Sequence, residues 1–72
     1  MTDKVKKEIL LKLASRIKEL RSERCLTQAQ AKIDTKIHFG RIEQGKRNIS
    51  YTTLHKICEY FEVSYKEFFD FD

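Results

Sequence analysis

Cysteine and histidine are the side chains that most often do chemistry in small proteins, and this sequence has few of them. Cys25 and Cys58 are the only cysteines, so the chain lacks the disulfide framework of small secreted domains, and we expect both thiols to be reduced. His55 and Cys58 lie three residues apart on an expected helix and could reach one metal ion, but no partner pair stands at zinc-finger spacing. We therefore expect neither a metal nor another cofactor, and we expect these side chains to be packed or exposed.

The sequence also shows none of the residue combinations that are typical of catalytic sites. The 72 residues show no paired carboxylates, no nucleophile matched with a base and no glycine-rich phosphate-binding loop. We therefore expect a binding protein and not an enzyme.

The charge pattern favours binding to a polyanion. Residues 59–72 hold five acidic side chains against Lys66, a net charge of −4, and since the whole chain carries +4, residues 1–58 carry +8. A basic body with a separate acidic end suits a polyanion-binding surface kept apart from a second contact face. A merely solvated basic surface would show the same charges.

The length of the chain predicts a single domain over residues 1–72. Such a short chain buries only about 60% of its unfolded surface, so its core is marginal and a partner would help it. The beginning, "MTDKVKKEILLKLASR", is basic and then apolar, as a signal peptide is, but Lys12 and Arg16 interrupt the apolar residues. No apolar run approaches the roughly 18 residues that span a bilayer. We expect a cytoplasmic protein without membrane contact.

Hydrophobic periodicity predicts a long first helix, from Thr2 or Asp3 to about Arg24. Apolar residues recur in it at spacings of three and four: Val5, Ile9, Leu10, Leu13, Ile17 and Leu20. Residues 1–13 extend this helix at its N-terminal end. Cys25 follows where a helix-ending glycine is usual.

Four shorter helices follow, each with its own capping residue. Thr27 caps a helix over "QAQAKI", and Asp34 or Thr35 caps the next, which runs to about Gln44 with Phe39 and Ile42 inward. Gly45 ends that helix in a left-handed turn. Ser50 caps a fourth helix, and Ser64, with Glu67 at capping-box spacing, caps a fifth. The inward residues expected on these two are Leu54, Ile57, Cys58, Phe61 and Phe68.

The second and third of these helices form the arrangement called helix-turn-helix, two short helices joined by a tight turn. The second helix of such a pair fits the DNA major groove, which is about 12 Å wide. Bare helix pairs are common, so the pattern alone leaves DNA binding and simple packing both open.

Three segments strengthen the first interpretation: "RIKELRSERCLTQ", "RIEQGKRNIS" and "TLHKICEYFEVSYKEFF". In order and spacing they resemble the Cro/repressor-type helix-turn-helix family, which includes phage repressors, xenobiotic-response-element-type regulators and restriction-modification controller proteins. The likeness covers about residues 14–69. It implies an all-α fold, a compact five-helix, repressor-like helix-turn-helix domain with an extended first helix. Between Thr27 and Glu43 the chain is about three residues shorter than the family, with "AQAKIDT" where the family has a Leu-Ala pair and a glycine, so we expect a short second helix.

The resemblance also implies which residues meet double-stranded DNA. Thr27 and Gln28 match the phosphate contact at the start of the second helix, although capping alone would explain Thr27. Positions that match the groove-facing side of the third helix are Lys36, Ile37, Gly40 and Arg41. Their other interpretation is an exposed polar face with Ile37 packed inside. Between these faces lies His38, which as a lone histidine suits packing or phosphate contact better than catalysis. The loop residues that match the family's phosphate clamp are Lys46, Arg47 and Asn48, which a solvated loop would also explain.

Two further sets of residues have structural roles in this interpretation. Arg21 and Glu43 match a pair that joins the first helix to the end of the third, the alternative being two unrelated surface charges. The acidic aromatic tail, residues 59–72, would form a homodimer through Tyr65, Phe69 and Phe71, which places recognition helices about 34 Å apart. The apolar N-terminal half of the first helix is the competing interface.

The expected function is therefore that of a dimeric, sequence-specific transcriptional regulator on a near-palindromic operator. Regulation would come from protein concentration, operator arrangement or contact with RNA polymerase. The alternative from another class is a protein-interaction module, such as an antitoxin or adaptor, that uses the same helices on a protein partner.

Overall fold

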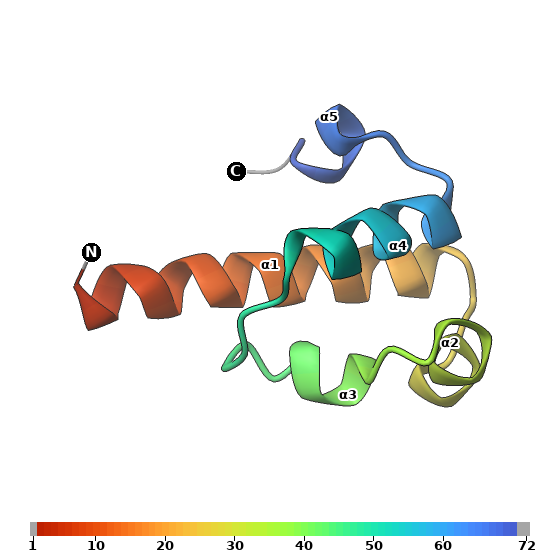
Figure 1. The fold of residues 1–72 in the computed structure, drawn as a ribbon, viewed down its shortest axis with the longest axis horizontal. Helices are drawn as coiled ribbons and strands as arrows, with labels where there is room; N and C mark the ends of the chain where they lie inside the picture. The colour runs from red at the N-terminus through yellow and green to blue at the C-terminus, as the bar shows by residue number, and fades with distance from the viewer. Residues whose placement is uncertain (1, 71–72) are drawn as a thin grey trace.

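Capped helices follow one another from end to end in the computed structural model, which describes residues 2–70. They are α1 (Asp3–Glu23), α2 (Gln28–Thr35), α3 (Phe39–Ile42), α4 (Tyr51–Phe61) and α5 (Tyr65–Phe68), and no strand occurs in residues 2–70. Helix α4 packs on α1, with α5 on one side of this pair and α2 and α3 on the other (Figure 1). The prediction of a compact, all-helical chain with five helices is confirmed.

The long helix α1 has the predicted bounds. The Thr2 hydroxyl accepts a hydrogen bond from the Val5 amide at its start, and Cys25 follows its end with a left-handed φ of 54°. Its 21 residues, at about 1.5 Å each, span nearly the longest dimension of the molecule, 34 Å. Residues 2–9 are all exposed and Leu10 is the first buried residue, so the N-terminal turns project beyond the other helices (Figure 1).

The boundary between α2 and α3 differs from the sequence-based prediction. The Asp34 carboxylate accepts a hydrogen bond from the side-chain amide of Gln30 at 2.8 Å, and the Thr35 hydroxyl donates to the Ala31 carbonyl at 2.7 Å. Both side chains therefore serve the last turn of α2, and the prediction that one of them caps the third helix is wrong. Lys36, with a left-handed φ of 64°, ends α2.

Helix α3 is consequently a single turn. His38 stands at its N-cap position without a side-chain capping bond, and residues 43–45 form a turn where the prediction continued the helix to Gln44. The expected short second helix is not found: α2 is two residues longer than "QAQAKI", and α3 is the short helix of the pair.

The caps of the last two helices are those predicted. The Ser50 hydroxyl accepts from the Thr53 amide at 3.2 Å. Ser64 and Glu67 form a reciprocal capping box, in which each side chain accepts from the other residue's amide. Because these bonds are local, four residues of sequence are enough to specify them.

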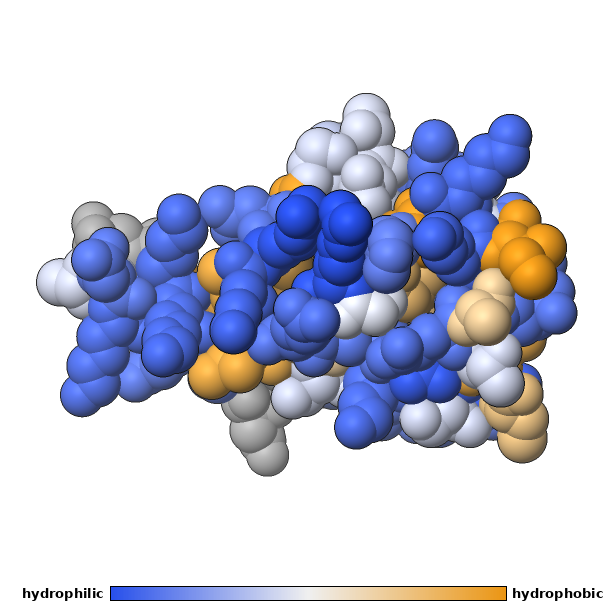
Figure 2. Space-filling view, turned by 90° about the horizontal axis from the view of Figure 1, so that it is seen from below, coloured by the Kyte–Doolittle hydropathy of each residue, from blue (hydrophilic) through white to orange (hydrophobic). Residues whose placement is uncertain are grey.

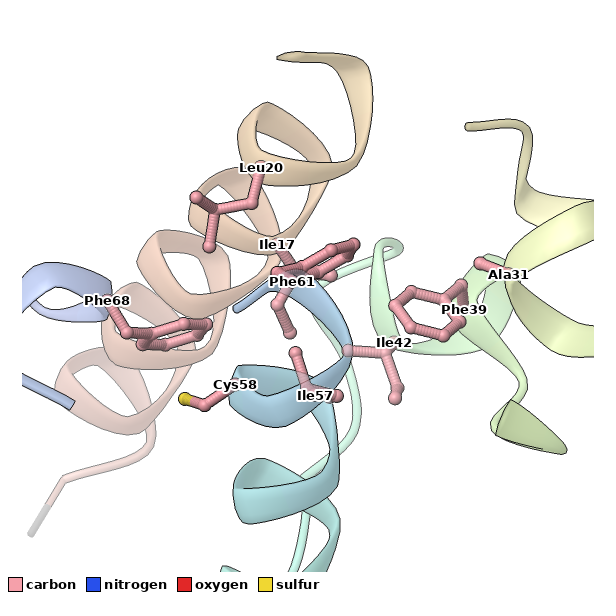
Figure 3. Close-up of a cluster of buried hydrophobic side chains, with 9 residues drawn as sticks. All are labelled: Ile17, Leu20, Ala31, Phe39, Ile42, Ile57, Cys58, Phe61 and Phe68. Atoms are coloured by element: carbon pink, nitrogen blue, oxygen red, sulfur yellow. The ribbon is translucent and has the colours of Figure 1, made fainter. Parts of the chain in front are cut away.

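The core is one cluster to which every helix contributes, as Figure 3 shows. Its buried members are Ile17, Leu20, Ala31, Phe39, Ile42, Ile57, Cys58, Phe61 and Phe68. Phe39 is fully buried and its ring meets that of Phe61 edge to face, with centroids 5.9 Å apart. Phe39 and Ile42 thus hold the single turn of α3 to the core, and the other side chains of this turn point outward.

Gly45 provides a test of the turn after α3. Its φ is +76°, in the left-handed region that was predicted, and an added Cβ would lie 2.6 Å from Leu11 Cδ2 on α1. We expect Gly45→Ala to lower the free energy of unfolding by at least about 1–2 kcal/mol, the usual cost of a left-handed alanine. Gly40→Ala is the control, because the nearest atom to its Cβ would be in the flexible Gln28 side chain, at 3.2 Å, and the His38 ring would lie at ordinary contact distance. Equal losses for the two variants in urea unfolding would contradict this account.

Candidate nucleic-acid interface

The turn before α3, α3 itself and the loop that follows surround one open hollow of about 390 Å³. Its charged lining is entirely basic: Lys36, Arg41 and Arg47, together with Lys56 from α4. His38 and Asn48 add hydrogen-bonding groups, and no acidic residue among residues 2–70 lines the hollow. On this side of the molecule, hydrophilic residues cover the middle of the surface, over α3 and its loop (Figure 2).

The arginines of the chain divide into two groups. Three of the five, Arg16, Arg21 and Arg24, donate hydrogen bonds to backbone carbonyls of other turns and so hold the fold together. The side chains of the other two, Arg41 and Arg47, make no hydrogen bond or ion pair with any residue in the range 2–70, and both line the hollow. Their charge is therefore available to a ligand.

The predicted groove-facing residues have different positions from those expected. Gly40 and Arg41 lie on α3, but Lys36 and Ile37 precede it, so their assignment to the third helix is wrong. Lys36 is exposed at the end of α2, whereas Ile37 is half-buried and packs against the core. The alternative interpretation of Ile37 as a packed residue is the one that this contact supports.

The start of α2 is already engaged in internal hydrogen bonds. The Thr27 hydroxyl caps the helix by accepting from the backbone amide of Gln30 at 3.0 Å, and the side-chain amide of Gln28 donates to the Glu43 carboxylate at 3.1 Å. Gln28 also lines a second hollow of about 180 Å³ with His38 and Gly40. Because His38 lines both hollows, the start of α2 adjoins the basic hollow.

The loop after α3 carries the three residues expected to clamp phosphates, and all three are exposed. Arg47 and Asn48 line the basic hollow, but Lys46 does not. Two of the loop's polar residues therefore line the same hollow as Arg41, and the third lies outside it.

The predicted ion pair between α1 and the end of α3 is confirmed. Arg21 donates to both carboxylate oxygens of Glu43, at 2.8 and 2.9 Å, and also to the Leu26 carbonyl at 2.7 Å. Only 13% of the Arg21 side chain and 4% of the Glu43 side chain are exposed. The hydrogen bond to Glu43 raises the pKa of Arg21 above its usual value. Glu43 is therefore neutralised inside the fold and does not oppose the basic surface outside it.

Two basic residues of this surface were missed by the sequence interpretation. Lys56 lies on α4 and reaches the basic hollow, while Lys32 lies on α2 and lines the smaller one. Each looks in the sequence like an ordinary polar residue of an amphipathic helix. Only the packing of α2 and α4 beside α3 brings them to the site.

No family model, curated protein or solved structure matches the chain. The likeness to Cro/repressor-type proteins accordingly rests on the segments quoted for it, and the role of this surface has to be argued from its chemistry.

His38 lines both hollows, whereas His55 and Cys58 make their contacts elsewhere. His55 interacts through one ring nitrogen with the Tyr65 hydroxyl and through the other with Glu59, while Cys58 is buried, with its thiol pKa raised by burial. Across residues 2–70, no three His, Cys, Asp or Glu side chains gather as metal ligands. In the same range, no helix combines the length and apolar character that crossing a membrane requires.

The expected dimer residues differ in their surroundings. Tyr65 is half-buried, with its ring 5.8 Å from that of Tyr51, and a hydrogen bond to Tyr51 together with burial raises its pKa to about 12. Phe69 is 50% exposed, and Phe71 lies outside the described residues. Of the two described rings, Phe69 offers the greater exposed surface.

Proposed function

We propose that the chain binds double-stranded DNA through the basic hollow, as a dimeric, sequence-specific transcriptional regulator on a near-palindromic operator. The observation that carries the proposal is the convergence of Lys36, Arg41, Arg47 and Lys56 on one hollow that none of the described acidic residues lines. These four positive charges repel one another unless an anion binds between them. The phosphate backbone of DNA supplies closely spaced negative charge. In this proposal α2 and α3 act as the helix-turn-helix unit.

The positions of the basic residues suit two different kinds of DNA contact, with base edges and with phosphates. Arg41 projects from α3, which its buried residues Phe39 and Ile42 fix to the core, so its guanidinium suits guanine O6 and N7 in the major groove. Arg47 and Asn48 lie on the loop and suit phosphate oxygens, which fix register without reading sequence. Lys56 would contact phosphate from α4.

The shortness of α3 changes which segment enters the groove. A single turn presents few outward side chains, so the turn before it, with Lys36 and His38, becomes part of the proposed reading surface. Thr27 and Gln28, at the start of α2, would meet the adjacent phosphates, with their present hydrogen bonds holding α2 in position.

An adaptor or antitoxin role, in which the acidic aromatic end binds another protein, is the second candidate. The observation in its favour is the half-exposed Phe69 beside Glu67 and Asp70 around a shared hollow. Binding that buries this end would respond weakly to salt compared with phosphate contact, so the salt dependence separates the two functions.

We expect Lys56→Ala to weaken binding to all duplexes and to lower the slope of log affinity against log salt by about one. Fluorescence anisotropy with a random-sequence duplex at two salt concentrations measures both quantities. Lys66→Ala is the matched control, because it removes the same charge from α5, on the opposite side of α1 and α4 from α3 (Figure 1). Wild-type binding without salt dependence, or equal losses in the two variants, would overturn the proposal.

A further inference from the structure

A second, apolar groove of about 400 Å³ opens between the N-terminal half of α1 and the start of α4. Its apolar wall consists of Ile9 and Leu13 from α1, Ile49, Tyr51 and Leu54 around the start of α4, and Phe69. Ile9 is 48% exposed and Tyr51 is more exposed still. The two dimer surfaces that the sequence suggested as competitors, the first helix and the aromatic tail, therefore border one and the same groove.

The apolar stripe of α1 continues out of this groove onto the projecting turns. Val5 precedes Ile9 by four residues, so the two lie on one face of the helix, and Val5 is 43% exposed. None of residues 2–9 is buried, although an isolated helical segment this short is marginal in water. A contact along the stripe would stabilise these turns and cover their apolar side chains.

Charges on the two sides of the groove are complementary. Lys6 lies three residues before Ile9 and Lys12 three residues after it, so both border the apolar stripe. Across Phe69, the groove adjoins a hollow whose charged lining is Glu67, Asp70 and Lys66, which leaves a net charge of −1. A helix that carried lysines beside its apolar stripe would thus meet carboxylates when its stripe entered the groove. The chain itself contains such a helix.

We infer that the partner for this groove is a second copy of the chain, and that the projecting turns of α1 from each copy cover the groove of the other. The two α1 helices then run antiparallel about a two-fold axis, with Val5 and Ile9 against Tyr51, Leu54 and Phe69 of the second copy, and with Lys6 toward its Asp70. Such a contact is self-complementary, as a two-fold interface must be. The interface contains both α1 and the tail, because α1 of each copy packs against the start of α4 and the tail of the other copy.

The position of the groove agrees with DNA binding. Ile49 and Ser50 line both the apolar groove and the basic hollow, so the two surfaces are neighbours. A dimer formed at the groove would therefore place the basic hollow of each copy next to the interface, and a two-fold pair of such surfaces suits two half-sites. The inference deepens the proposed function by naming the surface through which two copies associate, but its test contains no DNA and can fail or succeed independently.

Sedimentation velocity across a range of protein concentrations tests the apolar part of the contact. We expect the wild-type chain to dimerise, and Ile9→Glu to raise the dimer dissociation constant by more than about tenfold, since it puts a charged group in place of an apolar side chain that packs in the groove. Ile33→Glu is the matched control, because Ile33 is 72% exposed on α2, outside the groove. A monomeric wild-type chain, or a dimer that Ile9→Glu leaves intact, would overturn the inference.

A charge exchange tests the orientation of the two copies and does not depend on a core residue. Lys6→Glu and Asp70→Lys should each weaken the dimer, and the double variant should recover most of the loss, because the exchanged charges attract again. Both residues are exposed, so the variants should fold, which circular dichroism verifies. A double variant that dimerises no better than the weaker single variant would refute the antiparallel arrangement.

Discussion

Glu43→Ala should lower the free energy of unfolding by about 3–5 kcal/mol, a large part of the stability of so small a domain. The substitution leaves the Arg21 guanidinium with only the Leu26 carbonyl as acceptor at a largely buried position. It also removes the acceptor of the Gln28 amide, which links α2 to the end of α3. Urea unfolding followed by circular dichroism measures the loss.

A double-mutant cycle with Arg21→Ala distinguishes a true pair from two independent contributions. The double variant should lose less than the two single losses combined, because neither charge is then stranded in the interior. Glu19→Ala provides the control: Glu19 pairs with Arg16, but its side chain is 56% exposed, and such pairs contribute about 0–1 kcal/mol. Small and additive losses at Arg21 and Glu43 would mean that the pair contributes little.

The features that the sequence predicted well are those that local chemistry determines. Thr2, Thr27, Ser50 and Ser64 each accept a bond from an amide three residues ahead, so the start of the helix follows from a short segment. Gly45 likewise marks a left-handed turn because few other residues adopt one without cost.

The boundary of α3 could not be found in this way, because Asp34 and Thr35 can either begin a helix or complete one. What decides between these roles is partly distant in sequence: the Tyr60 hydroxyl on α4 donates to the Asp34 carboxylate at 2.5 Å and holds the end of α2. Burial and this bond raise the pKa of Tyr60 to about 12. Lys36 then adopts a left-handed conformation that the sequence gives no reason to expect.

The candidate site shows the same division between local and distant causes. Arg41 and Arg47 were found from the segment that contains them, whereas Lys56 reaches the hollow only because α4 packs beside α3. Sequence also could not separate the arginines by role, since Arg16 and Arg24 become structural only when their carbonyl partners from distant turns come into reach.

Arg41→Ala should cost about 1–3 kcal/mol at the preferred DNA site and relax the base preference there, whereas Lys46→Ala or Arg47→Ala should weaken binding to all sequences alike. The difference follows from how firmly the fold holds the backbone at each of these residues. Arg41 extends from a turn whose neighbours Phe39 and Ile42 are buried, and a side chain reads a base edge only if its backbone is held in register. Lys46 and Arg47 lie on an exposed loop, which suits contacts that are independent of sequence.

Selection of bound duplexes from a random library, carried out with each variant, measures this distinction directly. The wild-type, Lys46→Ala and Arg47→Ala proteins should select one consensus, with the slope of log affinity against log salt reduced by about one for each variant that loses a phosphate contact. Arg41→Ala should select the same site with one base pair per half-site no longer specified, because a bidentate guanine contact is lost. If the consensus survived Arg41→Ala unchanged, the reading residues would have to be sought in the turn before α3, where Lys36 and His38 are the exposed candidates.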